Sequence, residues 1–397
     1  MRVRASRIVL GLAGVALVLV AVNEFRPVTV VAATQSLAGS AGAGSSTALP
    51  WPAQAQSAVG AEGAGVLAST PNAKPLPIAS VAKVMTALVT LEAKPVRQGE
   101  QGPDITVTAD DVTTYQQDQA TGQSVMTVQA GEQLSEYQAL EGLLIPSGNN
   151  VATLLGNWAF GSTQALVQKM NDRAKGLGLT GTRFTDPSGL DPRTVSIPAD
   201  LVLLGETAMR DPVFAEIVGK GQDVLPVAGT VINVNYHLNH NGIVGIKTGS
   251  TQQAGAVYLY AGTHKLAGGR SVLIFGAVQN LPTLDMTFSA ADSLLQVVRQ
   301  NLQVEHVVSR QQTVGRINAP WGGASDVLAS TDLDVLTLPG TVVRSELKAQ
   351  VDAQAVSPGD QVGTLHVTAG PTSYEMPVTA AGQIDSPGPL WKAIRIG

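Results

Sequence analysis

The character of the sequence changes near residue 220, and this change limits the folds that the chain can adopt. Between residues 80 and 220 the apolar residues recur mostly at helical spacings, whereas from 227 to 278 strand-like segments alternate with turn residues. The expected helices are 80–93, 135–145, 162–176, 198–209 and 289–301, and the expected strands are 227–234, 242–248, 256–262 and 271–278. Strands joined by short turns form antiparallel sheets. The sequence therefore predicts an α/β fold with helices packed against an antiparallel sheet.

The regions before and after this part differ in composition. Residues 34–55 are rich in Ala, Gly, Ser and Pro, which predicts a flexible tether. A strand pair is expected at 58–69, at the start of a large domain that covers residues 56–305. Residues 306–397 contain short Val- and Leu-rich segments between Pro-Gly turns, which predicts a small all-β domain.

The N-terminal residues carry the pattern of an export signal. Arg2, Arg4 and Arg7 precede an unbroken apolar run from Ile8 to Val22, which is short for a membrane span. The nearest small-residue cleavage site, Val31-Ala-Ala33, lies rather far downstream, so a retained membrane anchor is an open alternative to a cleaved signal peptide. We therefore expect residues 1–33 to direct export to the outer face of the cytoplasmic membrane and the cell wall, or into the medium.

Charge and cysteine content exclude several classes of function. The formal net charge is −5, and it would fall to −8 without the three leader arginines, since Glu24 and Arg26 cancel. An acidic chain of this kind is a poor partner for nucleic acid. The absence of cysteine excludes disulfides, thiolate metal sites and a cysteine nucleophile.

Three short strings, found in a fixed order, carry the chemical signal. They are Ser80-Val-Ala-Lys83, Ser147-Gly-Asn149 and Lys247-Thr-Gly249. Each string is weak alone, because a serine three residues before a lysine arises by chance about once or twice in a chain of this length. Ser345-Glu-Leu-Lys348 has the same spacing, with neither of the other strings after it. Order and structural context must therefore separate a functional string from a chance match.

The first string opens the helix expected at 80–93, and a separation of three places the two side chains on neighbouring positions of that helix. The apolar residues of this helix are Val81, Val84, Met85, Leu88 and Leu91, which predicts one buried face. A serine hydroxyl is a poor nucleophile until a base takes its proton, and a lysine is a base only when burial or a nearby cation disfavours its charge. Lys83 can activate Ser80 in this way. A helix-capping serine with a solvated lysine is the alternative that this pair leaves open.

The other two strings supply polar groups at loop and strand positions. Pro146 ends the helix that Ser135 is expected to cap, which leaves Ser147 and Asn149 on a tight connection between helices. A hydroxyl there can relay a proton, and an amide can hold a lysine and a substrate carbonyl. Lys247-Thr-Gly249 is expected to end a strand, where a cation and a hydroxyl would face a cleft and Gly249 would let a substrate backbone approach. An ordinary turn and an ordinary strand end are the alternatives.

With the three strings in order, the sequence resembles the serine D,D-peptidases and the class A β-lactamases. It is most similar to the low-molecular-mass D-alanyl-D-alanine carboxypeptidases, which are penicillin-binding proteins. The similar stretches are Pro77-Ile-Ala-Ser-Val-Ala-Lys83-Val-Met-Thr-Ala87, Gly142-Leu-Leu-Ile-Pro-Ser-Gly-Asn149, Asp186-Pro-Ser-Gly-Leu-Asp191 and Gly245-Ile-Lys-Thr-Gly-Ser-Thr251. The resemblance covers residues 56–305, which would form a catalytic domain, and it extends to the β-rich tail. The catalytic domain would consist of an antiparallel sheet flanked by helices and a mainly helical subdomain.

The resemblance implies a role for each residue of the strings. Ser80 would form an acyl-enzyme, Lys83 would be its base, Ser147 would relay the proton and Asn149 would anchor the substrate. The substrate-binding positions would be Lys247 and Thr248, which clamp a terminal carboxylate, together with Gly249 and Ser250. The backbone N–H groups of Ser80 and Ser250 would form an oxyanion hole. Asn150 stands where the family often has aspartate.

The resemblance also implies the partners. The substrate would be the D-Ala-D-Ala end of peptidoglycan stem peptides in cell-wall maturation and cell shape, with β-lactams as inhibitors. It implies neither a cofactor nor a metal. His237-Leu-Asn-His240 is a weak metal pair, and the sequence has no His-Glu-x-x-His string, no Gly-x-Ser-x-Gly elbow and no phosphate-binding glycine loop.

Three other functions stay open. A β-lactamase would need a glutamate in a Glu-x-x-x-Asn arrangement after the second string, and Glu206 and Glu216 lack that partner. A D,D-endopeptidase would use the same acyl-enzyme. A non-catalytic wall-binding scaffold would keep the fold without needing the intact strings.

Overall fold

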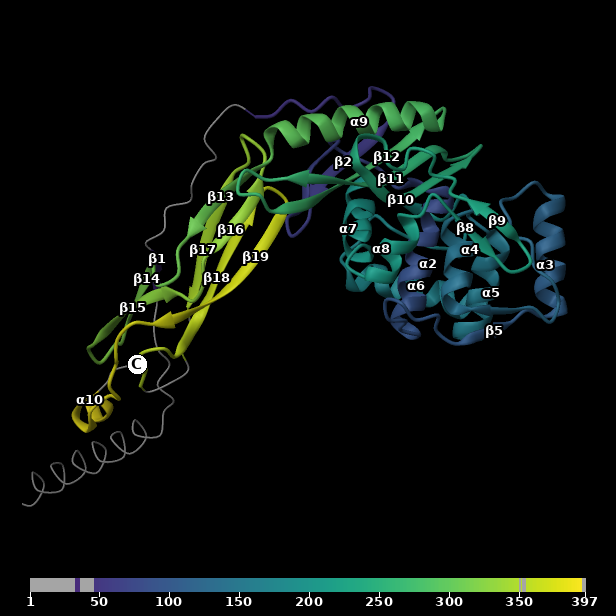
Figure 1. Cartoon of the computed structure of the whole chain (residues 1–397). Coiled ribbons are helices and arrows are strands. Elements are labelled where there is room, and N and C mark those ends of the chain that lie inside the picture. The colour runs from purple at the N-terminus through teal and green to yellow at the C-terminus, as the bar shows by residue number, and fades with distance from the viewer. Residues whose placement is uncertain (1–32, 36–45, 350, 352–354, 395–397) are drawn as a thin grey trace, which may run out of the picture. The chain divides into compact units, whose positions relative to one another are not determined.

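The computed structural model describes residues 33–35, 46–349, 351 and 355–394 (Figure 1). The expected export segment, apart from Ala33, lies outside these residues. Within them, no helix combines the length and the apolar character that crossing a bilayer requires. Backbone contacts divide the chain into two compact units. The larger contains residues 45–303 and 336–339, and the smaller contains 304–335 and 340–397 together with β1 (Ala33–Gln35).

Five antiparallel strands form the central sheet of the larger unit. In spatial order they are β10 (Ile243–Thr251), β11 (Gly255–Lys265), β12 (Ser271–Leu281), β2 (Gln56–Ala61) and β3 (Gly65–Ser69). Helix α9 (Leu284–Asn301) packs on one face, and α7 (Pro198–Ala208) packs on the other (Figure 1). The predicted α/β architecture is therefore confirmed, and β10 lies at a free edge of the sheet.

The other helices form a mainly helical region beside this sheet. They are η1 (Ala79–Ala82), α2 (Lys83–Ala93), α3 (Ala109–Ala120), α4 (Glu136–Leu144), α5 (Asn149–Phe160), α6 (Thr163–Gly176) and α8 (Pro212–Val218), with a short turn η2 (His240–Gly242) before β10. Three short strand pairs connect them: β4 (Leu76–Pro77) with β7 (Val195–Ser196), β5 (Asp104–Thr106) with β6 (Gln133–Ser135), and β8 (Gln222–Leu225) with β9 (Gly229–Ile232).

Local sequence explains where several of these helices begin and end. Ser135 Oγ accepts from the Gln138 N–H while Gln138 Oε1 accepts from the Ser135 N–H, and this reciprocal pair caps α4 as expected from the sequence. Pro198 occupies the first turn of α7, where its missing N–H costs nothing. Gly161 ends α5 with a φ of 80°.

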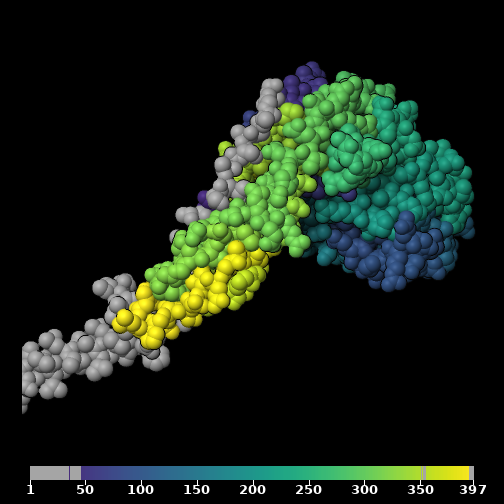
Figure 2. Space-filling view, turned by 60° about the vertical axis from the view of Figure 1, so that its left-hand side comes forward, coloured from purple at the N-terminus to yellow at the C-terminus, as the bar shows by residue number. Residues whose placement is uncertain are grey.

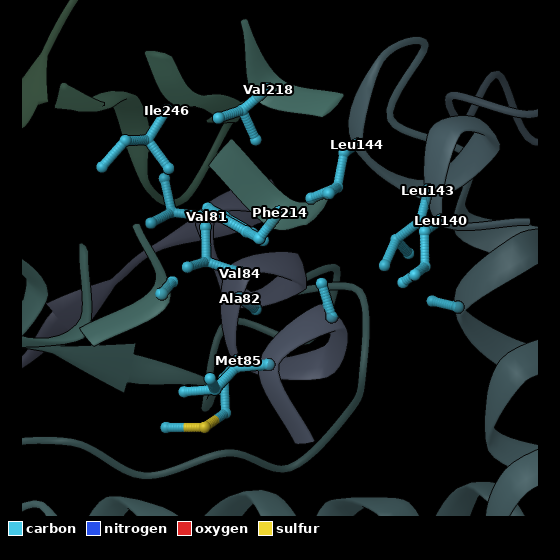
Figure 3. Packing of buried hydrophobic residues seen from close by; sticks show 14 of the residues in the cluster. Val81, Ala82, Val84, Met85, Leu140, Leu143, Leu144, Phe214, Val218 and Ile246 are labelled. Atoms are coloured by element: carbon cyan, nitrogen blue, oxygen red, sulfur yellow. The ribbon is translucent and has the colours of Figure 1, made fainter. Parts of the chain in front are cut away.

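Helix α2 is buried on all sides, whereas the sequence predicted a single buried face. Thr86 and Thr90 are as inaccessible as Val84, and their hydroxyls donate to backbone carbonyls. Figure 3 shows Val84 and its neighbours among side chains of α4, α8 and β10. The prediction was wrong because apolar periodicity does not reveal that satisfied threonines line the remaining faces of a central helix.

Other elements also depart from the predicted ones. Helix α3 was not predicted because none of its residues is buried, so it lacks apolar periodicity. The strand expected at 227–234 is present in part as β9, which pairs with β8 in a separate hairpin outside the central sheet, and α9 begins at Leu284 after the capping residue Thr283. The string Lys247-Thr-Gly249 was expected to end a strand, but β10 continues to Thr251 and stays paired with β11.

The smaller unit contains a six-stranded sheet and a two-stranded pair, and its surface runs from green to yellow in Figure 2. The six strands are β1, β14 (Thr313–Asn318), β15 (Ala324–Ala329), β19 (Thr372–Ala380), β18 (Gln361–Ala369) and β17 (Val343–Ala349), and the pair is β13 (Gln303–Val308) with β16 (Leu333–Thr337). A short helix, α10 (Pro389–Ile394), follows. The structure differs from the predicted tether at two places, because residues 33–35 pair with β14 and Trp51 packs against the apolar cluster beneath α9.

A glycine in the central sheet accommodates a buried tyrosine. Gly276 of β12 lies opposite Tyr260 of β11, and a Cβ atom built on Gly276 would collide with the Tyr260 ring. Tyr260 is fully buried, so its ring has no free space to move into. The pair therefore fixes how β11 and β12 pack beneath α9.

We expect Gly276→Ala to destabilise the larger unit by about 1–3 kcal/mol, the usual cost of overpacking a core. Urea unfolding followed by circular dichroism measures this change. Gly268→Ala is the matched control, because a Cβ at Gly268 meets no atom within 4 Å. Equal stability of the two variants would contradict the packing described for Tyr260.

Candidate active site

The amine of Lys83 lies at the centre of a cluster of oxygen atoms from four segments. Its Nζ lies 3.0 Å from Ser80 Oγ, 3.3 Å from Ser147 Oγ, 2.6 Å from Asn149 Oδ1 and 3.3 Å from the Ser188 carbonyl oxygen. These groups come from η1, the α4–α5 connection, the start of α5 and the loop after α6. The structure therefore brings together the four residues that the first two strings supplied, and adds a carbonyl.

Burial controls the charge of this amine. Lys83 is completely inaccessible to solvent, and this desolvation, assisted by the positive charge of Lys247, holds the pKa of Lys83 well below its ordinary value. Asp186 and Asp118 oppose the shift from a distance. An amine with a lowered pKa can accept a proton near neutral pH, which a solvated lysine cannot do.

A strained turn presents Ser80. Ala79, the residue before it, has a φ of 46°, which a residue with a Cβ adopts at a cost of about 1 kcal/mol or more. Ser80 then lies in the 3-10 turn η1 and Lys83 begins α2, so the chain reaches the helix through a tighter turn than the regular helix that the sequence predicted. This tight turn brings the hydroxyl and the amine together.

The loop after α6 holds the Ser188 carbonyl against Lys83. The Asp186 carboxylate accepts from the Ser188 N–H, the Leu190 N–H and the Thr194 hydroxyl, so one side chain fixes the loop. Gly189, with a φ of 80°, lets the loop touch Ala79, where any side chain would collide. The loop is thus built to approach the turn that carries Ser80.

The α4–α5 connection is held just as firmly. Ser147 has a φ of 66°, and the Asn149 N–H donates to the Ser124 carbonyl at 2.8 Å. The Asn150 amide forms two bonds with the backbone of Met126, accepting from its N–H at 3.0 Å and donating to its carbonyl at 2.9 Å. An aspartate at 150 could accept the first bond but not donate the second, so asparagine suits this chain.

Strand β10 forms the other wall. Lys247 and Thr248 are buried, and burial lowers the pKa of Lys247 to about 7. Lys247 Nζ donates to the Thr248 carbonyl at 3.1 Å, and the Thr248 hydroxyl lies 3.4 Å from the Val234 carbonyl. Ser250 is exposed on the same strand.

Gly249 lets β10 approach the turn at Ser80. A Cβ on Gly249 would lie 2.8 Å from the Ser80 nitrogen and 3.0 Å from both Ala79 Cβ and the Ile78 carbonyl oxygen. The approach of a substrate backbone to Gly249 stays a prediction, and in the structure the absence of a side chain at Gly249 is also required by the contact between β10 and the Ser80 turn.

A cavity of about 580 Å³ opens beside the amine cluster. Asn149 and Ser188 line it next to the cluster, and Thr153, Val167 and Leu190 extend it toward α5, α6 and the following loop. Asn149 and Ser188 therefore belong both to the wall of the cavity and to the cluster around the Lys83 amine.

The competing strings and residues lie in other surroundings. Ser345 and Lys348 are on β17, where Ser345 Oγ accepts from Gln35 instead of facing an amine. Glu206 accepts from the Gly63 N–H and from Arg210, and Glu216 accepts from the Tyr137 hydroxyl. These bonds hold the two glutamates at structural positions.

The weak metal pair has a structural explanation as well. His237 stacks on Phe288 with ring centroids 4.7 Å apart, and its Nε2 lies 3.0 Å from Asp292. His240 stacks on the other histidine at 5.2 Å. The two rings are therefore packed against α9 and each other.

Comparison with known proteins assigns the larger unit to a family. Residues 45–274 match the D-alanyl-D-alanine carboxypeptidase family of serine peptidases, which is more than half of the chain. The chain belongs to this family. It is a serine-type carboxypeptidase that acts on the cell wall, outside the cytoplasm.

Individual relatives agree with this assignment. The D-alanyl-D-alanine carboxypeptidase DacF of Bacillus subtilis is 26% identical over 331 residues, which are 78% of this chain and 80% of that protein. The carboxypeptidase DacB2 of Mycobacterium tuberculosis is 34% identical over 205 residues, which are 50% of this chain and 65% of that protein. The crystal structure of penicillin-binding protein 5 from Haemophilus influenzae superposes with a TM-score of 0.67 at 20% identity, covering 85% of this chain and all of that one. The last likeness confirms the fold.

Some residues of the carboxypeptidase site had no signal in the sequence. The Ser188 carbonyl is a backbone group, and only the string that begins at Asp186 pointed to its loop. Gln123, whose Oε1 accepts from Asn149 Nδ2 at 2.7 Å, lies in a segment without any motif. Tertiary packing places the Ser188 carbonyl beside Lys83 and Gln123 beside Asn149.

We expect Gly249→Ala to slow acylation of Ser80 by penicillin about 10- to 100-fold, because the added Cβ would push the Ser80 turn away from β10 at an overpacking cost of about 1–3 kcal/mol. Stopped-flow or gel-based labelling with a fluorescent penicillin measures the rate. Gly221→Ala is the control, since a Cβ there meets nothing within 4 Å. A wild-type rate in Gly249→Ala would show that the close approach is not needed.

Proposed function

We propose that this enzyme removes the terminal D-alanine from peptidoglycan stem peptides through an acyl-enzyme on Ser80. The observation that carries the proposal is the fully buried amine of Lys83, 3.0 Å from the Ser80 hydroxyl, with its pKa lowered. Such an amine supplies the base that a serine nucleophile lacks.

The first step uses Ser80 and Lys83. The Ser80 hydroxyl donates its proton to Lys83 Nζ while Oγ attacks the carbonyl carbon of the penultimate D-alanine. Negative charge that develops on the carbonyl oxygen is stabilised by the N–H groups of Ser80 and Ser250, the first held against β10 by Gly249. One donor of this kind is typically worth about 3 kcal/mol in the transition state.

The second step breaks the peptide bond. Ser147 Oγ lies 3.3 Å from Lys83 Nζ and passes the proton on to the leaving nitrogen, so that terminal D-alanine departs as a neutral amine. Water then hydrolyses the ester, and Ser80 recovers its proton. A β-lactam acylates Ser80 by the same route.

The remaining groups bind the substrate. Lys247 and Thr248 hold the terminal carboxylate, Asn149 Nδ2 donates to a substrate carbonyl, and the cavity beside Asn149 receives the preceding part of the stem peptide. Residues 56–305 form the catalytic domain in this proposal, and 306–397 a β-rich domain that follows it. Residues 1–33 export the chain and leave it secreted or bound to the outer face of the membrane.

We expect Ser80→Ala to abolish both penicillin labelling and D-alanine release from a D-Ala-D-Ala pentapeptide, because the variant lacks the hydroxyl that the acyl-enzyme needs, and Ser147 relays a proton in this proposal instead of attacking. Mass spectrometry of the protein and chromatography of the peptide products measure the two outcomes. Ser345→Ala is the matched control, since it alters the serine of the string with the same spacing on β17, and it should retain full activity.

Labelling of the Ser80→Ala protein would refute the assignment of the nucleophile. Defined cross-linked muropeptides in the same assay distinguish carboxypeptidase action from endopeptidase action, since only an endopeptidase cuts the cross-link and releases monomeric muropeptides. Rapid turnover of a chromogenic cephalosporin would instead identify a β-lactamase. A role in the envelope that survives Ser80→Ala would favour the scaffold.

The two lysines predict the pH dependence of kcat/KM, which reports groups of the free enzyme. Lys83 acts as a neutral base, so the rate rises as pH increases through its lowered pKa. Lys247 binds a carboxylate when charged, so the rate falls as pH increases through about 7. We therefore expect a bell-shaped profile for a peptide that ends in a free carboxylate.

The same peptide with a C-terminal amide provides the control. It does not use the charge on Lys247, so its lower kcat/KM should lack the falling limb near pH 7. Identical profiles for the two peptides would show that Lys247 does not recognise the carboxylate.

A further inference from the structure

A single hydrogen-bonded chain of side chains ends at the amine of Lys83. The Thr121 hydroxyl lies 3.1 Å from the Gln117 carbonyl and 3.0 Å from the Asp118 carbonyl, both of which can only accept. Because its hydrogen is used there, Thr121 Oγ1 accepts from Gln123 Nε2 at 2.9 Å. Gln123 Oε1 in turn accepts from Asn149 Nδ2 at 2.7 Å, and Asn149 Oδ1 accepts from Lys83 Nζ at 2.6 Å.

All bonds of this chain therefore run in one direction. An amide side chain can present either its oxygen or its nitrogen, and its neighbours decide which. The Asp118 carboxylate also accepts from Gln123, which again requires the amide nitrogen to point away from Asn149. The acceptors around Thr121 and Gln123 thus determine that Asn149 presents its oxygen, and not its nitrogen, to Lys83.

The orientation of Asn149 matters because of the number of hydrogens on a neutral amine. Neutral Lys83 has two N–H groups and one lone pair. Asn149 Oδ1 and the Ser188 carbonyl can only accept, and both lie within hydrogen-bond distance, so they take the two N–H groups. The lone pair then faces the hydroxyls of Ser80 and Ser147.

A reversed Asn149 amide would change this arrangement. Its Nδ2 would donate to the Lys83 lone pair, and the amine could no longer accept the Ser80 proton. We propose that Gln123 is a positioning residue that fixes the Asn149 amide with its oxygen toward Lys83, and so keeps the lone pair of the base free for Ser80. This inference rests on the roles of Ser80 and Lys83 proposed above.

Backbone contacts hold Gln123 where this role requires it. The Asn149 N–H donates to the Ser124 carbonyl, and the Asn150 amide binds both backbone groups of Met126. The segment that carries Gln123 is thus attached to the start of α5 on the same turn as Asn149. Only one hydrogen of Asn149 Nδ2 is used by Gln123, which leaves the other for a substrate carbonyl.

The test is the rate of Ser80 acylation by a fluorescent penicillin as a function of pH, with intact protein. In Gln123→Leu we expect the maximal rate to fall at least about 10-fold, because the Asn149 amide is free to reverse. The rising limb should also move to lower pH, because a donor to the neutral amine disfavours its protonation.

Gln123→Glu keeps an acceptor for Asn149 Nδ2 and serves as the conservative variant. We expect it to recover the rate to within about three-fold of wild type. Its rising limb should move to higher pH, because an added carboxylate favours the charged lysine. The charged groups that already act on Lys83 are Lys247 on β10, Asp186 in the loop after α6 and Asp118 on α3, and all variants keep them.

Two further variants separate a positioning role from a structural one. Gln119→Leu changes an exposed glutamine of α3 whose side chain donates to the Tyr115 hydroxyl, away from Lys83, and this variant should match wild type. Thr121→Val removes the exposed hydroxyl that accepts from Gln123. It should lower the acylation rate and move the rising limb of the pH profile in the same directions as Gln123→Leu does, but by less.

The outcomes are distinct. A wild-type rate and pH profile in Gln123→Leu would overturn the inference, as would equal slowing of Gln123→Leu and Gln123→Glu with an unmoved limb. If wild-type enzyme is not acylated at Ser80, the proposed function fails and the inference with it. Opposite shifts of the limb in the two variants would establish the orienting role.

Discussion

The structure of the site depends on the burial of one lysine. Moving an ammonium group out of water costs several kcal/mol even after the protein relaxes, unless other groups replace the lost water. Lys83 finds Asn149 and the Ser188 carbonyl as replacements, and they come from segments far apart in the sequence. The amine therefore has these hydrogen-bond partners only when α5 and the loop after α6 are packed against it, which couples the fold to the proposed chemistry.

The sequence predicted the parts of the site that consist of side chains in motifs. Helical spacing pairs Ser80 with Lys83, and a proline-ended helix leaves Ser147 and Asn149 on one connection, because these are local properties that one segment determines. Helix α3 and the full burial of α2 could not be predicted, since both depend on what packs nearby and not on periodicity. Similarly, the Ser188 carbonyl has no sequence signature, because every residue has a carbonyl.

The surroundings of Gly249 illustrate the same limit. A glycine in a strand indicates that another group comes close to the strand backbone, but the sequence does not identify that group. In the structure that group is the backbone around Ser80, and Gly189 plays an equivalent part against the carbonyl of Ala79. Two glycines therefore allow close packing around a residue with a φ of 46°, in the turn that presents the proposed nucleophile.

The two buried lysines also explain how the proposed carboxylate recognition by Lys247 and the proposed base role of Lys83 can coexist. A charge on Lys247 lowers the pKa of Lys83, so the two amines disfavour simultaneous protonation. A substrate carboxylate at Lys247 would stabilise the charge there and at the same time cancel its field at Lys83. Binding of the correct terminus thus needs the proton on Lys247, and the neutral state of Lys83 then rests mainly on burial. For this reason the desolvation of Lys83, more than its neighbouring charge, is the property that suits it to the proposed role of base.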